Sequence, residues 1–327
     1  MNFRFLALRT RLALACFSIF SVMLNQAHAQ SFPNKPVKLV NSFPPGGPSD
    51  VLARSLGEAM QQTLKQPFVV ENRAGAGGNL GADFVAKSPA DGYTVLIGID
   101  TTFTINPSIY KNMPFKLGDL KPIMVMASSG LLLGVNPGSG IKTVNDFLSR
   151  ARSDKGLTFS SGSNGSPGHL AVGILNDFSQ THITHIPYKG NTPAVTAVIA
   201  GEVDGGVLAT PGMLPFVKAN KLTALAVTSR KRSNLAPDIP TTAELGLKDL
   251  SLEVLYIAMV PAATPADVIA TLQKSMSDAL ARPDIKERLQ AQDLLIEAET
   301  GNAAAQRIEA LRNRYAPIIK ATGMQIE

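Results

Sequence analysis

The sequence has no tryptophan, a single cysteine and few aromatic residues of any kind. The cysteine, Cys16, falls in an N-terminal stretch that we expect to be removed on export. The mature chain would then have neither a disulfide nor a free thiol, and its stability must come from a packed core. A chain of about 300 residues can bury such a core, usually as two domains.

A strong net charge is also absent. The chain has 31 lysines and arginines against 25 aspartates and glutamates. The N-terminal leader holds three of the arginines and no acidic residue, so the mature chain carries a formal charge of only +3. This excess is too small for the basic surface typical of nucleic-acid-binding proteins. Beyond the leader, no uninterrupted apolar run reaches the length of about 20 residues that a membrane-spanning helix needs.

Residues 1–29 are predicted to be a signal peptide. A basic segment with Arg4, Arg9 and Arg11 precedes a mostly apolar segment at 12–24 and an Ala-His-Ala sequence at 27–29. This order is typical of a secretory signal that is cleaved, here near Ala29. Lipid attachment to Cys16 is the alternative, but the apolar residues that follow Cys16 place it inside the signal core.

Beyond the leader, short β-rich runs alternate with amphipathic segments of helical length. Strands are predicted at 37–42, 68–71, 93–98, 122–126, 131–135, 157–160, 183–187, 203–208, 222–228 and 254–260. Helices are predicted at 50–64, 79–87, 144–152, 167–178, 193–200, 265–281 and 302–320. Such alternation predicts an α/β fold with mostly parallel sheets flanked by helices. Ligands of such folds bind at the carboxyl ends of the strands.

Two short segments of small or polar residues, 127–130 and 249–251, are candidate hinges. They predict a discontinuous first lobe, residues 31–128 plus 252–327, and an inserted second lobe, residues 129–251. A chain that crosses twice between lobes can close around a ligand.

Two glycine-rich loops each lie between a predicted strand and a predicted helix. The first glycine-rich loop reads PPGGPSD at 44–50, and the second reads SSGSNGSPGHL at 160–170. The first N–H groups of a helix have no partner within the helix and carry a partial positive charge. A loop that opens a helix can therefore bind an anion, and two such loops suggest a clamp for a carboxylate.

The chain resembles the Bug-type periplasmic solute-binding receptors of tripartite tricarboxylate transporters, in order and over nearly all of its mature length. The similarity is carried by FPPGGPSDVLARSLGEAM at 43–60, ENRAGAGGNLGADFVAKSPADGYTVLIG at 71–98, NPSIYKNMPF at 106–115, SSGSNGSPGHLA at 160–171, HIPYKGNTPAVTAVIAGEVD at 185–204, LTALAVTSRKRSNLAPDIPTTAELGL at 222–247 and VPAATP at 260–265.

The resemblance implies a two-lobed periplasmic-binding-protein fold of the Venus-flytrap, type II-like kind. It also implies a periplasmic receptor that holds a small organic acid between the lobes and delivers it to membrane transporter subunits. Family members grip a ligand carboxylate with a loop from each lobe. Carried over to this chain, those loops supply Pro45, Gly46, Gly47, Ser49 and Asp50 from the first, and Ser161, Gly162, Ser163, Asn164, Gly165 and His169 from the second.

Further candidates come from the strand-end rule. Thr101 and Thr102 follow the strand predicted at 93–98, and Tyr188 and Thr192 follow the strand predicted at 183–187. A surface turn is the alternative for the two threonines, and the role of Lys189 stays open. Backbone and hydroxyl contacts at Tyr188 and Thr192 are favoured over the lysine ammonium.

Several candidate residues have structural alternatives. Asp50 can hold the ligand or simply stabilise the first turn of its helix. His169 can reach the ligand or cap and pack its own helix. Arg73 can meet a second carboxylate, although the resemblance marks its block as structural. His182 and His185 point to opposite faces of a strand, which disfavours a metal site.

No metal, nucleotide or other cofactor is expected, and we expect a monomer. A hydrolytic enzyme is the main rival from another class, but no G-x-S-x-G motif occurs. A sensor that feeds a signalling partner is the other alternative. The chain departs from many relatives at 208–211, where it reads LATP without an acidic or amide residue, and at Leu255-Tyr256, where many have tryptophan. These changes predict a different pocket and disfavour an amino-acid ligand, while the identity of the acid stays open.

Overall fold

The computed structural model describes residues 32–325. Its strands are β1 (Val37–Asn41), β2 (Phe68–Asn72), β3 (Thr94–Ile99), β4 (Leu120–Val135), β5 (Leu157–Ser161), β6 (Ile183–Pro187), β7 (Gly205–Ala209), β8 (Thr223–Val227), β9 (Glu253–Pro261) and β10 (Leu295–Thr300). Its helices are α2 (Pro48–Leu64), α3 (Asn79–Ala86), α4 (Thr101–Thr104), α5 (Asn106–Ile109), α6 (Val144–Ala151), α7 (Pro167–Phe178), α8 (Asn191–Ala200), α9 (Thr210–Lys218), α10 (Ala266–Ala281), α11 (Pro283–Gln290) and α12 (Gly301–Ala321). The predicted signal peptide lies outside the described residues.

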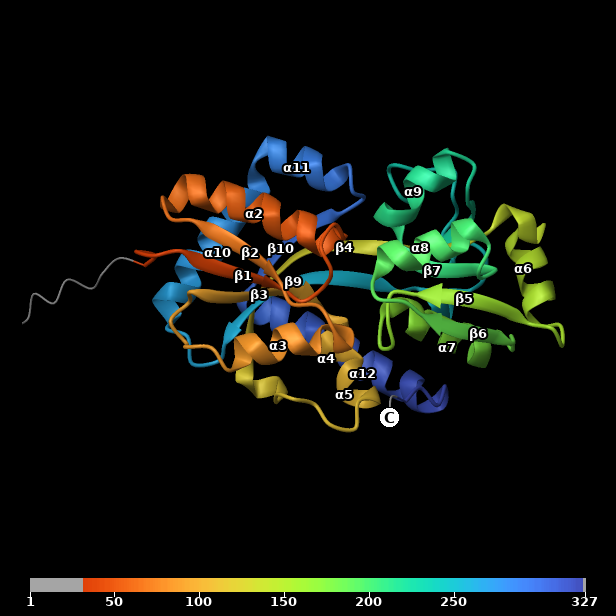
Figure 1. The fold of residues 1–327 in the computed structure, drawn as a ribbon, viewed down its shortest axis with the longest axis horizontal. Helices are drawn as coiled ribbons and strands as arrows, with labels where there is room; N and C mark the ends of the chain where they lie inside the picture. Colours follow the sequence, from red (N-terminus) through yellow and green to blue (C-terminus); the bar gives the residue numbers. More distant parts are fainter. Residues whose placement is uncertain (1–31, 326–327) are drawn as a thin grey trace, which may run out of the picture. The chain divides into compact units, whose positions relative to one another are not determined.

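The fold is α/β, as predicted, with helices on the faces of a mixed sheet (Figure 1). The strand order is β2-β1-β3-β9-β4-β7-β5-β6, and β8 and β10 also pair with β4. The outer pairs are parallel: β1 with β2 and β3, and β5 with β6 and β7. The inner pairs, which involve β4 and β9, are antiparallel. The expectation of mostly parallel sheets therefore holds only away from the centre.

The first candidate hinge is not a loop. Residues 127–130 lie inside β4, where Ala127 pairs with Tyr256 and Gly130 with Glu253. Since β4 pairs with β9 along its first part and with β7 and β8 along its last part, it belongs to both halves of the sheet. Small residues suit this segment because neighbouring chains approach closely. A β-carbon added at Gly130 would lie 2.8 Å from the hydroxyl of Ser229.

Five short elements were missed by sequence reasoning: α4, α5, α9, α11 and β10. The helix α9 contains Pro211 and Pro215, which disfavour a helical interpretation. Pro211 is nonetheless the second residue of α9, where no intrahelical donor is needed. The strand β10 is only partly buried and carries Glu297 and Glu299, so it lacks the alternation of a half-buried strand.

Two separate clusters of buried apolar residues form the core. One draws on β1, β3, β4, β9 and α12 and includes Leu96, Val125 and Ile257. The other draws on β4, α8, β7, α9 and β8 and includes Leu132, Val198 and Val227. Residues 35–327 nevertheless form one compact unit. The exact division into two lobes stays a prediction.

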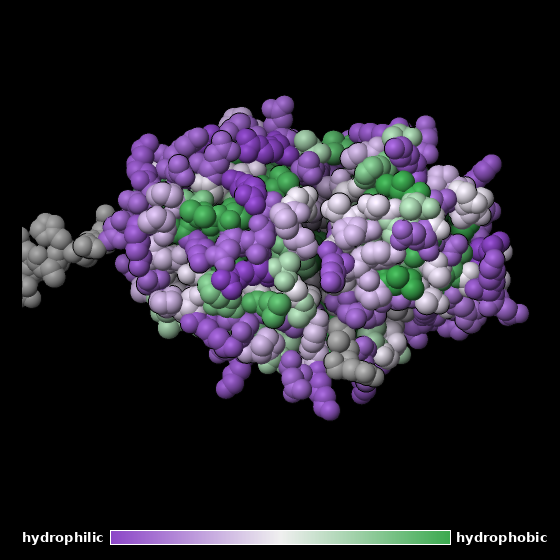
Figure 2. Space-filling view, in the orientation of Figure 1, coloured by the Kyte–Doolittle hydropathy of each residue, from purple (hydrophilic) through white to green (hydrophobic). Residues whose placement is uncertain are grey.

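No helix within residues 32–325 is long and apolar enough to cross a membrane. On the face drawn in Figure 2, hydrophilic side chains cover most of the surface, and hydrophobic ones appear as separate patches.

Candidate functional site

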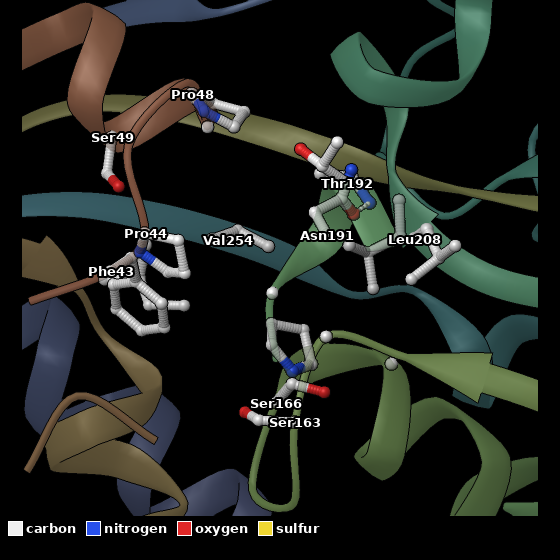
Figure 3. A pocket seen from close by; sticks show the side chains of 18 of the residues that line it. Phe43, Pro44, Pro48, Ser49, Ser163, Ser166, Asn191, Thr192, Leu208 and Val254 are labelled. Atoms are coloured by element: carbon white, nitrogen blue, oxygen red, sulfur yellow. Dashed lines mark hydrogen bonds between the residues drawn. The ribbon is translucent and has the colours of Figure 1, made fainter. Parts of the chain in front are cut away.

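A cavity of about 320 Å³ opens between the two glycine-rich loops. The first loop contributes Pro45, Gly47 and Ser49, and the second contributes Gly162 and Ser163. Strands from the middle of the sheet complete the wall with Leu131 of β4, Leu208 of β7 and Val254 of β9. Figure 3 shows the side chains of Ser49, Ser163 and Thr192 around this space, each from a different segment of the chain. The volume is at the lower end of the range of about 300–1,000 Å³ typical of small-molecule sites.

Four helices begin at the cavity. The residues that precede their first turns, Gly47 of α2, Ser166 of α7, Gly190 of α8 and Ala209 of α9, all line it. Each helix also has proline within its first three residues: Pro48, Pro167, Pro193 and Pro211. Proline suits this position because the N–H that it lacks would have no partner in the helix. The sequence predicted two such helix starts, and the structure adds those of α8 and α9.

These helix starts make the cavity favourable for an anion. Ser166 accepts a hydrogen bond from the His169 amide at 3.3 Å, whereas Gly47, Gly190 and Ala209 supply no side-chain cap in the described part of the chain. In α2 the Ser49 amide remains available to a ligand, since Pro48 has no N–H and the Asp50 amide donates to the Gly47 carbonyl at 3.0 Å. First-turn amides of α8 and α9 also remain available. The positive ends of the helix dipoles add to their effect.

No lysine, arginine, histidine or acidic side chain within residues 32–325 is among those that line the cavity. The attraction for an anion therefore comes from backbone amides, helix dipoles and hydroxyl groups. The hydroxyl of Ser49 has no hydrogen-bond partner among the described residues, although Ser49 is only 4% exposed. Because Ser49 lines the cavity, this hydroxyl can donate to a ligand there.

Asp50 supports the first loop from behind and is not part of the cavity wall. Its carboxylate accepts two bonds from the Arg54 guanidinium, at 2.9 and 3.0 Å, and one from the Asn72 amide at 2.8 Å. It also accepts the Gly46 amide at 3.1 Å. Burial by itself would raise the pKa of Asp50, but these hydrogen bonds and the Arg54 charge hold it below its usual value. Asp50 is therefore a charged anchor for the loop.

The second loop has a neutral support. The rings of His169 and His185 stack with centroids 3.9 Å apart. His169 Nδ1 accepts the Gly165 amide at 3.2 Å, and His185 Nε2 lies 2.5 Å from the Ser161 hydroxyl. Burial lowers the pKa of His169 to about 4, and burial together with the neighbouring His169 lowers that of His185 to about 3. Both rings are therefore neutral at physiological pH.

Thr101 and Thr102 lie in the core next to the cavity and not on its wall. The Thr102 hydroxyl donates to the Gly77 carbonyl at 2.9 Å, and the Asn106 amide donates to the same carbonyl at 3.0 Å. These bonds hold the turn at 75–78, where Gly77 and Gly78 have positive φ. Arg73 contacts Glu71 and the ring of Phe84, so it serves the neighbouring structure.

The structure thus brings part of the predicted set together at the cavity. Six predicted residues line it: Pro45, Gly47, Ser49, Gly162, Ser163 and Thr192. Nine others are not among the lining residues: Gly46, Asp50, Thr101, Thr102, Ser161, Asn164, Gly165, His169 and Tyr188. The Tyr188 hydroxyl donates instead to Glu202, at 3.3 Å. The described residues contain no group of three or more histidine, cysteine or acidic side chains placed to hold a metal.

Sequence reasoning missed several lining residues, above all Asn191, Tyr256 and the apolar residues of the strands. Asn191 is the first residue of α8, and its side-chain oxygen accepts the Ala209 amide at 2.9 Å. It therefore ties the starts of α8 and α9 together. The signal for it was available, because Asn191 follows the strand predicted at 183–187. Tyr256 lies in β9, whose position beside β3 and β4 only the sheet order reveals.

The sequence profile of the tripartite tricarboxylate transporter family receptors matches residues 52–324. This chain belongs to that receptor family. It is 32% identical over 302 residues to protein BugT of Bordetella pertussis, across 91% of this chain and 93% of BugT. The resemblance to this receptor family, which rested on blocks of this one sequence, is thereby confirmed.

Two solved structures of similar proteins contain organic acids. The R. palustris protein Rpa4515, solved with adipate, is 29% identical, with a TM-score of 0.85 over 90% of this chain and 99% of that one. MatC of Rhodopseudomonas palustris, solved with bound malate, is 27% identical, with a TM-score of 0.82 over 88% of this chain and 100% of that one. The predicted resemblance to periplasmic binding proteins is therefore confirmed at the level of the fold.

Proposed function

We propose that this protein is a periplasmic solute-binding receptor that captures a small organic acid in the cavity between its glycine-rich loops. It then delivers the acid to the membrane subunits of a tripartite tricarboxylate transporter. The observation that carries the proposal is the convergence of four helix starts on one cavity, on whose wall residues 32–325 place no charged side chain. Family membership and the adipate and malate bound to similar proteins support a carboxylate as the ligand.

The binding residues that we propose are the six predicted residues on the cavity wall, together with Asn191. The other predicted residues act on the ligand indirectly, since Asp50 and His169 bind the backbone of the two loops. A hydrogen bond to a charged group contributes about 1.5–3 kcal/mol. Association itself costs about 4–15 kcal/mol, so several donors and enclosure of the ligand are both needed.

Enclosure is explained by the two lobes that we propose, residues 31–128 plus 252–327 and residues 129–251. Each lobe supplies one glycine-rich loop, and β4 and β9 connect them. Closure would bring the amides of both loops onto the same carboxylate. The receptor acts as a monomer in this proposal and needs no cofactor, and binding leaves the acid chemically unchanged.

Thermal unfolding of the purified protein with a panel of organic acids tests this proposal. A receptor is stabilised by its ligand without turnover, because a ligand that binds only the folded state raises the free energy of unfolding. Conversion of an acid would indicate an enzyme instead.

Ser49→Ala should weaken binding of the stabilising acid about tenfold or more, since one donor to the carboxylate is lost. Ser149→Ala, on the exposed surface of α6, is the control and should leave binding unchanged.

Capture of the transporter subunits by the ligand-loaded protein, followed by uptake of the acid in cells, tests the delivery step. Loss of uptake on deletion of the receptor, with restoration by the intact chain, supports transport. Capture of a signalling protein in place of transporter subunits, with uptake intact, would favour a sensor.

A further inference from the structure

The wall of the cavity is polar where helices begin and apolar where strands pass. The first turns of α2 and α8 contribute Ser49 and Thr192, and the loop before α7 contributes Ser163, whereas the strands β4, β7 and β9 contribute Leu131, Leu208 and Val254. Figure 3 shows Val254 and Leu208 at the strands, with Ser49 and Thr192 where α2 and α8 begin. The site therefore offers one kind of environment to a carboxylate and another to the rest of the ligand.

Two polar side chains, those of Tyr256 and Asn191, lie beside the apolar part of the wall, and the side-chain oxygen of each is engaged in a hydrogen bond. The Tyr256 hydroxyl is 3.2 Å from the hydroxyl of Ser129, and Tyr256 is only 2% exposed. The Asn191 side-chain oxygen accepts the Ala209 amide, while its side-chain NH2, at the start of α8, has no hydrogen-bond partner among the described residues and stays available to the ligand carboxylate. Among the residues that the structure describes, the wall has no cation for a second carboxylate and no carboxylate for an ammonium group.

A second charge on the ligand would be costly at this wall. When a carboxylate loses its water without gaining a hydrogen-bond partner or an opposite charge, the binding free energy becomes less favourable by several kcal/mol. Hydrocarbon in the same place gains about 25 cal/mol for each Å² removed from water. The two contributions have opposite signs, so the wall discriminates between a charged and an apolar distal end.

We infer that the ligand is a monocarboxylate with an apolar body. Its carboxylate binds at the helix starts, and its hydrocarbon part packs against Leu131, Leu208 and Val254. This inference rests on the proposed function and narrows the class of acid. It separates this chain from the similar proteins solved with adipate and malate, both of which are dicarboxylates.

Calorimetric titration of the purified protein with three six-carbon probes tests the inference. Hexanoate has one carboxylate, adipate has two, and hexanamide has the same chain without a charge. We expect hexanoate to bind at least tenfold more tightly than either of the others. Adipate binding as tightly as hexanoate, or more tightly, would overturn the inference and leave the proposed function intact. Binding of none of these acids, nor of any other organic acid in the stability panel, would overturn both.

Phe43 provides a variant that sharpens the result. Its side chain is half-buried and lines the cavity, so a lysine can be accommodated there with its ammonium directed toward the ligand. Phe43→Lys should reduce the preference for hexanoate over adipate at least tenfold, because the second carboxylate gains an opposite charge. The matched variant Phe43→Leu keeps the wall apolar and should keep the preference. An unchanged preference in a folded Phe43→Lys protein would contradict the assigned role of the wall.

Discussion

The two glycine-rich loops have a similar form but different supports. The first is held by the buried carboxylate of Asp50, which binds Arg54, Asn72 and the Gly46 amide. The second is held by two stacked neutral imidazoles, His169 and His185, which bind the Gly165 amide and the Ser161 hydroxyl. Each support engages the backbone of a loop that opens a helix at the cavity. The comparison shows that an anion site can be shaped by a charged or by an uncharged scaffold.

The physical difference lies in how each support responds to its surroundings. The Asp50 network depends on a negative charge that several donors stabilise, so losing the acceptor removes a partner from each of those donors. The histidine pair depends on the absence of charge, because a proton on His169 Nδ1 would remove the acceptor of the Gly165 amide. The first loop should therefore be more sensitive to mutation, and the second more sensitive to acid.

The largest effect is expected from Asp50→Ala. The change removes the acceptor of the Gly46 amide and one acceptor each of the Asn72 amide and Arg54, and should lower the free energy of unfolding by about 2–4 kcal/mol. Asn72 and Arg54 keep their bonds to the Phe43 carbonyl and to Asn72 Oδ1. Arg54 is half exposed, so water compensates for part of its loss. The measurement is urea-induced unfolding.

The matched control for Asp50 is Asp278→Asn in α10. Asp278 and Lys274 have the same four-residue separation, but both are exposed, so the expected loss is about 0.5 kcal/mol or less. Equal losses for the two variants would show that the first loop does not depend on its buried carboxylate.

A second comparison concerns the glycines with left-handed backbone in the two loops. Gly46 has φ +79° with open space around it, and Gly165 has φ +74°. A β-carbon at Gly165 would lie 2.6 Å from Asn106 Oδ1 and 2.7 Å from Ile109 Cδ1. Gly46→Ala should cost only the backbone strain, about 1–2 kcal/mol. Gly165→Ala should cost more because steric overlap is added to the same strain. A larger loss of stability for Gly46→Ala in urea unfolding would contradict this interpretation.

A third comparison concerns the helix starts. Ser166 caps α7 through the His169 amide, so Ser166→Ala should lower the free energy of unfolding by about 1 kcal/mol. Ser49 makes no such bond within the described part of the chain, so Ser49→Ala should stay within about 0.5 kcal/mol of the original protein. Ligand titration of the same variants should show the larger loss of affinity for Ser49→Ala. The reverse pattern would exchange the structural and binding roles of the two serines.

The smallest effect at neutral pH is expected from His185→Gln. The glutamine amide can still donate to the Ser161 hydroxyl, and the imidazole that it replaces is uncharged at that pH. The difference should grow in acid. The pKa of His185 is about 3 in the folded protein against an ordinary value of 6.5, so the unfolded chain takes up the proton first. Protonation of His185 therefore lowers the free energy of unfolding as the pH falls from about 6.5 toward 3.

The variant should lose this part of the acid sensitivity. Asp100 acts in the opposite direction, because burial raises its pKa to about 7, but it contributes equally in both proteins. Urea unfolding at several pH values gives the difference between them. Parallel pH profiles for the original protein and the variant would contradict a role for His185 in acid sensitivity.

Regular strand–helix units were predictable from the sequence because their signals are local. The strand at 183–187 and the helix at 167–178 were predicted with the bounds that the structure has. Both glycine-rich loops were found for the same reason, since proline, glycine and a helix start lie within a few residues of one another. Among the elements that were not predicted, α9 contains two prolines and β10 is only partly buried.

The site was predictable only in part. Ser49 and Ser163 were found because they belong to loops with a recognisable pattern. Asp50 and His169 belong to the same loops but turn toward supporting residues, Arg54 and His185, and that choice depends on packing. The apolar wall could not be predicted from the sequence, because a leucine or valine in a strand has the same local pattern whether it faces the core or a cavity.

The sequence by itself determined the alternation of strands and helices, the family, and the two loops that can bind an anion, because each depends on residues that are close along the chain. Only the tertiary structure decided that four helices begin at one cavity and that, in the part of the chain that the structure describes, no charged side chain lies on its wall. These properties arise from strands and loops more than a hundred residues apart, which the sheet order brings together. Whether the cavity favours one carboxylate or two is set by that assembly, because the environment of the ligand's distal end comes from β4, β7 and β9 and not from either loop.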